Sequence, residues 1–157
     1  MRTLIAQDFT LQDLTKLRHA VSEQARSCGL HGPRLDDFVL AVHESVVNAI
    51  EHAGGRGRFK LWTVDGVIRS ETSDRGAGIP EAYMNGAKRP SDESHTGRGI
   101  YLIRRLCDAA DFRTGPGGTT VLLTMRLPRE SGPRASRSMR RIRVTAPGGR
   151  PFGRFTA

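Results

Sequence analysis

The spacing of apolar residues predicts two helices in the first third of the chain. From Thr10 onward, leucine, valine and alanine recur at every third or fourth position, which places them on one helix face. Thr10 has the side chain of an N-cap, and Gly29 ends this first helix. A second helix is expected over residues 34–53, closed by Gly54-Gly55. Its apolar stripe contains Leu35, Val39, Val42, Val46, Ala49 and Ala53.

Alternating positions and turn residues predict the remaining elements. Asp65-Gly66 separates two alternating runs and is typical of a two-residue hairpin turn. Residues 97–109 repeat apolar side chains at helical spacing. Strands are expected at 3–8, 58–64, 67–72, 111–114 and 119–127. The order of these strands and helices predicts an α+β fold, a two-layer α/β sandwich.

The composition fits one domain of ordinary size. The chain has 157 residues, of which 37% are hydrophobic. It has no apolar run of the roughly 18 residues that a membrane span needs, and its first residues lack the apolar stretch of a signal peptide. Cys28 and Cys107 have no metal-ligand spacing, so we expect two reduced, packed thiols. A cytoplasmic protein with a folded domain over residues 1–128 is therefore expected.

Positive charge is concentrated at the C-terminal end. The net charge is +9, and residues 129–157 contribute eight arginines against one acidic residue. Arg, Ser, Pro and Gly dominate that stretch, which predicts a disordered basic tail. Such a tail attracts phosphates, but Phe152 and Phe155 are its only aromatic residues. A solvated tail is therefore favoured over a nucleic-acid-binding segment.

Glu44 and Asn48 are four residues apart in the second helix and therefore share a face. The carboxylate can orient a hydroxyl group or accept its proton. The Asn48 carbonyl oxygen can bind Mg²⁺, which prefers oxygen ligands. His52, one turn further on, can join this face, although a packing role is favoured for it. Taken alone, the segment favours an ordinary polar helix face.

Asp74 follows an expected strand and precedes Gly76 and Gly78. A carboxylate at a strand end can accept the amino hydrogens of adenine. Glycines beside it allow the backbone to approach a flat base closely. The same residue types are also common in polar turns, which is the alternative interpretation of this segment.

Gly97-Arg98-Gly99-Ile100 opens the expected third helix after a long polar connection of the kind that forms lids or mobile loops. Backbone N–H groups at a helix start favour phosphate oxygens, and Arg98 adds positive charge there. Thr119 begins the last expected strand. Its hydroxyl group can reinforce a nucleotide pocket, or it can simply be a β-branched residue in a strand.

These motifs, in this order, resemble those of the GHKL ATPase superfamily, which includes gyrase, the heat-shock ninety chaperones, histidine kinases and MutL. Residues 44–53 resemble its N box, 74–80 its G1 box and 96–102 its G2 box. The resemblance covers about residues 35–127. It implies the Bergerat ATP-binding fold, with a mixed, mostly antiparallel sheet and helices on one face.

Within that superfamily, the chain is most similar to the small anti-sigma-factor serine kinases, because the domain is compact and its G2 box continues as Gly-Ile-Tyr-Leu-Ile-Arg-Arg-Leu-Cys-Asp. This resemblance implies ATP and Mg²⁺ as cofactors. It implies two partners, an anti-sigma antagonist that is phosphorylated on a serine and a sigma factor that is sequestered. Members of this family often form homodimers.

The resemblance also assigns roles to individual residues. Glu44 becomes the base or hydroxyl positioner, Asn48 the Mg²⁺ ligand and Asp74 the adenine ligand. Gly76 and Gly78 are expected to shape the base pocket. Gly97, Arg98 and Gly99 are expected to contact the phosphates. One departure is the strand over 67–73, which is more polar than is usual in the family.

Two alternative functions accompany this interpretation. The chain can be a nucleotide-binding regulator that acts by protein contact without catalysis. A sensor histidine kinase is disfavoured, because the chain has no room for a separate dimerisation helix pair that carries a phosphoacceptor histidine.

Overall fold

A computed structural model of the chain describes residues 1–84 and 95–129. The strands in these residues are β1 (Arg2–Thr10), β2 (Arg56–Val64), β3 (Val67–Ser73), β4 (Ala109–Gly115) and β5 (Gly118–Arg126). The helices are the 3₁₀ turn η1 (Leu11–Asp13), α1 (Leu14–Ser27), α2 (Gly32–His52), α3 (Glu81–Met84) and α4 (His95–Leu106). Apart from Arg129, the expected tail over 129–157 lies outside the described residues, as do residues 85–94 of the long connection.

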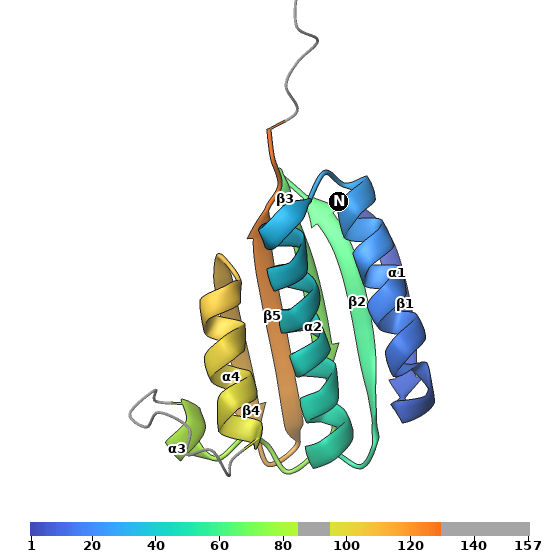
Figure 1. The fold of residues 1–157 in the computed structure, drawn as a ribbon. Coiled ribbons are helices and arrows are strands. Elements are labelled where there is room, and N and C mark those ends of the chain that lie inside the picture. The colour runs from blue at the N-terminus through green and yellow to red at the C-terminus, as the bar shows by residue number, and fades with distance from the viewer. Residues whose placement is uncertain (85–94, 130–157) are drawn as a thin grey trace, which may run out of the picture.

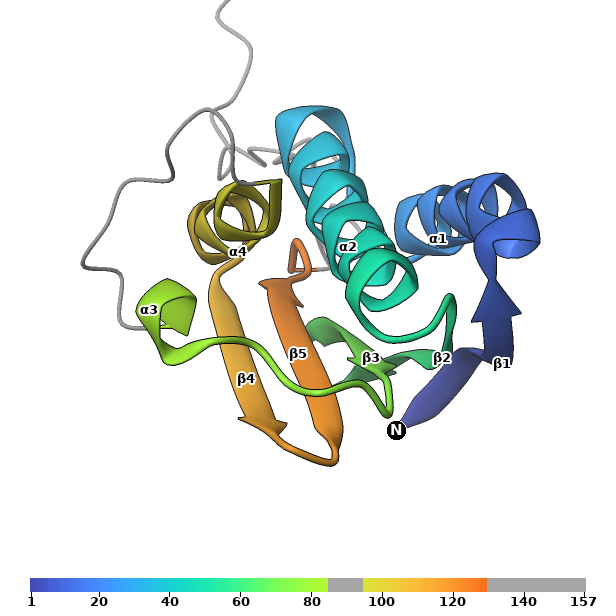
Figure 2. The same cartoon turned by 90° about the horizontal axis from the view of Figure 1, so that it is seen from below.

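The strands form one sheet in the order β1-β2-β3-β5-β4, and helices α1, α2 and α4 lie side by side on one of its faces (Figures 1 and 2). The predicted two-layer α+β fold is therefore confirmed. Every strand pairing among the described residues is antiparallel, so the sheet is not mixed. The reason is that β5 returns between β3 and β4 and runs opposite to both. Within the described residues, no helix is both long and apolar enough to span a membrane.

Local signals set most element boundaries. Asp65 and Gly66 both adopt positive φ angles, 47° and 76°, as the expected tight hairpin requires. Thr10 is the N-cap residue of a helical segment, and its N–H donates to Asp13 Oδ2 at 2.9 Å, although its own side chain makes no capping hydrogen bond. That segment begins as the 3₁₀ turn η1, however, and the α-helix starts only at Leu14. Such 3₁₀ turns are common at helix ends and carry no distinct sequence pattern.

The core lies between the sheet and the layer of α1, α2 and α4, with α2 running over the middle of the sheet (Figure 2). The fully buried side chains include Phe38 of α2, Phe59 of β2 and Leu123 of β5. Both cysteines are free thiols, as expected, and both are half-buried. Burial raises the pKa of Cys28, and it raises the pKa of Cys107 to about 12. Neither thiol is therefore an activated nucleophile.

Hydrogen bonds among Arg34, Asp108 and Arg126, here called the polar clamp, join three segments. They link the start of α2 to the residues just after α4 and to the last residue of β5. Arg34 donates to Asp108 Oδ2 at 2.6 Å and to the Arg126 carbonyl oxygen at 3.2 Å. The Arg126 N–H donates to the same Asp108 oxygen at 2.7 Å. The hydrogen bond from Arg34 is the main reason that the pKa of Asp108 is lowered. One carboxylate thus holds three separate chain segments together.

Replacing Asp108 with Asn is expected to lower the free energy of unfolding by about 1 kcal/mol at pH 7, because a charge-assisted bond in a partly exposed site is lost. Since the folded pKa is below the ordinary value of 3.8, the wild-type advantage is present above that pH and fades as the pH falls through the lower folded value. Urea denaturation at pH 7 and at pH 3 measures both effects. The exposed Asp111→Asn serves as the control, and equal stability of D108N and wild type at pH 7 contradicts the clamp.

Candidate nucleotide-binding site

Glu44 and Asn48 lie on the flank of α2 that faces α4. A Cβ atom added to Gly99 of α4 would lie 3.2 Å from Glu44 Oε2 and from both the Oδ1 and Nδ2 atoms of Asn48. The two side chains thus share a face, and Gly99 allows α4 to approach that face closely. The N-box and G2-box segments, about fifty residues apart in sequence, therefore meet at one point in the fold.

The Asp74 carboxylate is fixed by the backbone around it. Its Oδ1 atom accepts hydrogen bonds from the N–H of Gly76 at 2.9 Å and from the N–H of Thr119 at 3.1 Å. The Asp74 N–H in turn donates to the Thr119 carbonyl oxygen at 2.9 Å. Among the described residues, no group donates a hydrogen bond to Oδ2. The side chain therefore offers one acceptor in a set direction.

The glycines after Asp74 are positioned by close packing. Gly78 has a φ of 89°, and a Cβ there would lie 2.5 Å from the Gly115 carbonyl oxygen. The next residue, Ile79, donates its N–H to Thr114 Oγ1 at 2.6 Å. A Cβ on Gly76 would lie 2.7 Å from Ala53 Cβ. The segment is thus held between the end of α2 and the β4–β5 turn.

A cavity of about 340 Å³ opens between the end of α2, strands β3 and β5, and the segment that leads into α3. It falls within the size range of ligand sites in proteins. Five of the residues predicted from sequence line it, namely Asn48, His52, Asp74, Gly78 and Thr119. The other lining residues, which sequence reasoning did not name as site residues, are Ser45, Ala49, Thr72, Ile79, Pro80, Tyr83 and Val121. Strand alternation was the available signal for Thr72, which is two residues before Asp74 and therefore on the same face.

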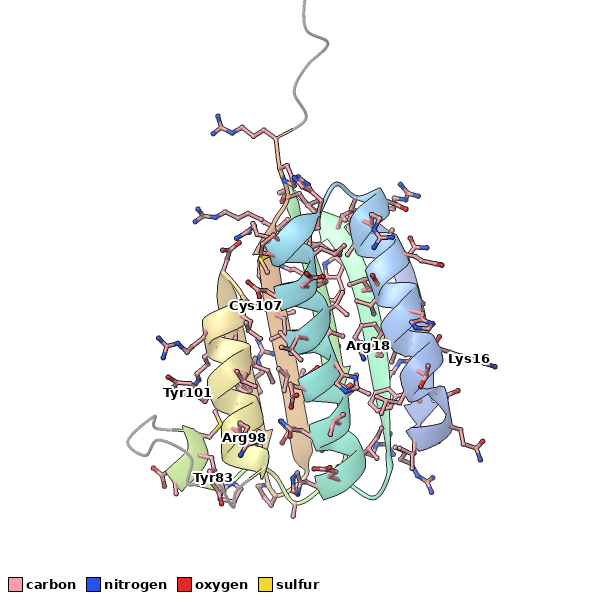
Figure 3. All side chains as sticks on the ribbon, in the orientation of Figure 1. Lys16, Arg18, Tyr83, Arg98, Tyr101 and Cys107 are labelled. Carbon is pink, nitrogen blue, oxygen red and sulfur yellow. The ribbon has the colours of Figure 1, made fainter. Side chains whose placement is uncertain are left out.

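The remaining predicted residues lie on or beside α4. The helix begins at His95, so the expected start at Gly97 was two residues late, and Gly97 lies within the first turn. Arg98 is exposed, at the same end of the molecule as Tyr83 (Figure 3). Ile100 is 1% exposed, so its side chain contributes to the interior. Gly99 packs against α2 and does not line the cavity.

Two histidines lie near Glu44 and Asn48 in the sequence. His52 lines the cavity and its Nε2 lies 3.8 Å from the Glu51 carboxylate. His43 is half-buried, and its pKa is lowered chiefly by burial, then by the charge of Arg18, with Glu44 acting in the opposite direction. His43 is therefore neutral at pH 7 and does not line the cavity.

Comparison with known proteins identifies the class. A family model described as the histidine kinase-like ATPase domain matches residues 8–125. The chain belongs to this family of ATPase domains, and its open antiparallel sheet with helices is consistent with the GHKL ATPase fold.

Solved structures give the same fold. The chain is similar to the RsbU and RsbW domains of Rv1364c from Mycobacterium tuberculosis, at 23% identity and a TM-score of 0.57, over 78% of this chain and 32% of that one. It is also similar to the histidine kinase domain of a blue-light activated kinase from Erythrobacter litoralis, at 20% identity and a TM-score of 0.50, over 73% and 63%. The chain thus spans less than two thirds of either protein, and at these identities the likeness concerns the fold alone.

The packing around Gly78 leads to a stability prediction. Gly78→Ala is expected to lower the free energy of unfolding by about 2 kcal/mol or more, since it adds a Cβ at a positive φ angle against a backbone carbonyl. Gly117→Ala is the matched control, because a Cβ there has no atom within 4 Å. Chemical denaturation of both variants measures the difference. Equal stability of the two variants would contradict the close contact with Gly115.

Proposed function

We propose that the chain binds ATP with Mg²⁺ and acts as a serine protein kinase of the anti-sigma-factor type. The observation that carries the proposal is a cavity lined by Asp74 and Asn48, with Glu44 close to Asn48 on the same helix. Asp74 offers a free acceptor from the sheet, Asn48 lines the cavity from α2, and Glu44 lies one turn earlier on α2. Membership in the ATPase family supports this interpretation.

At the sheet end of the cavity, Asp74 would bind the base. Its Oδ1 atom is saturated by two backbone N–H groups, which leaves Oδ2 to accept from the exocyclic amine of adenine. The positive φ angle of Gly78 allows the chain to pass close to the β4–β5 turn. Ile79 adds an apolar side chain to the wall of the cavity. A carboxylate that is held in position before binding loses little conformational freedom on binding, which favours affinity.

At the α2 end, Asn48 and the first turn of α4 would meet the phosphates. Among the described residues, no three His, Cys, Asp or Glu side chains form a metal site. That is compatible with Mg²⁺, which commonly takes one or two protein oxygens and completes its shell with phosphate and water. Mg²⁺ at Asn48 would neutralise charge on the phosphates. Arg98, exposed in the first turns of α4, would add positive charge.

Glu44 would orient the attacking serine hydroxyl group or accept its proton. Phosphoryl transfer depends mainly on positioning and charge stabilisation, so a small set of residues can support it. The serine would belong to an anti-sigma antagonist, and the kinase would alternatively sequester a sigma factor, in keeping with the resemblance of the N, G1 and G2 boxes. The likeness to a structure that contains an RsbW domain is compatible with this choice.

One observation favours a second function, that of a nucleotide-binding regulator without catalysis. Glu44 Oε2 lies against Gly99 of α4, and Glu44 is absent from the cavity lining. In this arrangement the carboxylate contributes to helix packing. Binding of ATP and regulation through protein contact would then occur without phosphate transfer.

The first experiment tests nucleotide binding. Asp74→Asn keeps an oxygen for the two backbone N–H groups but replaces the free acceptor with an amide donor, so the affinity for ATP should fall by about tenfold or more. Isothermal titration calorimetry with ATP, with and without Mg²⁺, measures this change. Asp111→Asn, on the exposed side of β4, should bind like wild type. If D74N binds ATP as tightly as wild type, Asp74 is not the base ligand.

The second experiment separates the two functions. Glu44→Gln should slow transfer of the γ-phosphate by about 100-fold or more if Glu44 handles the proton, while the affinity for ATP stays near the wild-type value. Labelled ATP reports transfer to a serine of an anti-sigma antagonist protein or to water. Glu23→Gln, exposed on α1, is the control. Detectable wild-type turnover that E44Q retains in full would remove Glu44 from the mechanism.

A further inference from the structure

Two buried residues that carry hydroxyl groups line the cavity. Ser45 of α2 and Thr72 of β3 are each 2% exposed, and their oxygen atoms lie 2.8 Å apart. Both residues line the same cavity as Asp74. Ser45 lies within the N-box segment, but the sequence assigned no role to it or to Thr72, and a strand position facing the core is normally apolar. Their placement at the base end of the cavity therefore calls for a functional explanation.

The hydrogen-bond pattern fixes which of the two hydroxyl groups donates. Ser45 Oγ lies 2.7 Å from the Val42 carbonyl oxygen, which can only accept. The single hydroxyl hydrogen of Ser45 is therefore committed to Val42. Between the two hydroxyl groups, Thr72 must then donate and Ser45 must accept. Thr72 has no second hydrogen, so toward the cavity its Oγ1 can act only as an acceptor.

Thr72 and Asp74 are two residues apart on β3 and its continuation, so their side chains lie on the same face. Both present acceptors, Thr72 through Oγ1 and Asp74 through Oδ2. The exocyclic amine of adenine carries two hydrogens that can each be donated. A 6-oxo purine carries a carbonyl oxygen at that position, which would face a carboxylate and a hydroxyl oxygen with no hydrogen to offer.

We propose that Thr72, held as an acceptor by Ser45, is a specificity residue that selects a 6-amino purine nucleotide over a 6-oxo purine nucleotide. This inference rests on the proposed nucleotide-binding function and goes beyond it by naming a second residue, besides Asp74, that recognises the base. Thr72 accepts a hydrogen bond from the base amine beside Asp74. Ser45 acts through Thr72 as a positioning residue, because it holds the Thr72 hydroxyl group as an acceptor.

The test compares ATP with inosine triphosphate, which differs at the 6 position of the base, by calorimetry on the full chain. Thr72→Val keeps the shape of the side chain and removes the acceptor. It should weaken ATP binding by about tenfold and change inosine triphosphate binding by less than about twofold. The affinity for ATP divided by the affinity for inosine triphosphate should therefore fall, and this quotient is the ratio used below. Thr120→Val, on the other face of the sheet, is the matched control and should leave the ratio unchanged.

Ser45→Ala provides a second variant that retains Thr72. Without Ser45 Oγ, the Thr72 hydroxyl group can rotate and donate to a 6-oxo group, so binding of inosine triphosphate should strengthen and the ratio should fall again. Circular dichroism checks that each variant is folded. If T72V does not fold, S45A alone tests the proposal.

The outcomes separate this inference from the proposed function. Wild-type protein that binds neither nucleotide would overturn both. Wild-type protein that binds both equally well, or a T72V variant that loses equal affinity for the two, would overturn the role of Thr72 and leave nucleotide binding in place. A reduced ratio in T72V and S45A, with an unchanged ratio in T120V, supports the proposal.

Discussion

The fold depends on how α2 lies across the sheet. One face of this helix is buried against β2, β3 and β5, and its flanks contact α1 and α4. Small side chains such as Ala41 and Ala49 allow this close approach, as does Gly99 on the neighbouring helix. Because packed cores tolerate little displacement, the position of α2 also fixes the residues at its cavity end. Burial of one helix face thus determines where Asn48 and Ser45 lie relative to Asp74.

Strong local signals made much of the fold predictable from sequence. The Asp65-Gly66 turn specified the β2–β3 hairpin, since only a few residue pairs accept its positive φ angles. The apolar stripe of α2 predicted the face that the structure buries. The spacing of apolar residues predicted the order of helices and strands, and that order predicted the two-layer fold. Boundaries were less predictable, because a 3₁₀ turn precedes α1 and α4 starts two residues early.

The internal roles of the site residues could not be predicted in the same way. Asp74 was expected to bind a ligand, but the sequence does not reveal that one of its oxygens is committed to the Gly76 and Thr119 N–H groups. Gly99 was expected to contact phosphates, and the structure places it against Asn48. The polar character of β3 was visible from sequence, yet its pairing with Ser45 depends on packing between elements far apart in the chain. Such contacts arise only once the helix layer is in place.

The two ends of the proposed site rest on different kinds of structure. At the base end, Asp74 and Thr72 belong to β3 and its continuation, and the hydrogen bonds to Thr119 and Ser45 hold them there. At the other end, Glu44 is positioned by the contact between α2 and α4, which involves a glycine and no hydrogen bond to its carboxylate among the described residues. A shift of α4 along α2 would therefore alter the surroundings of Glu44 and leave Asp74 unchanged. The proposed recognition of the base and the proposed transfer of phosphate therefore depend on separate contacts in this fold, so a change at the α2–α4 contact can affect the second without affecting the first.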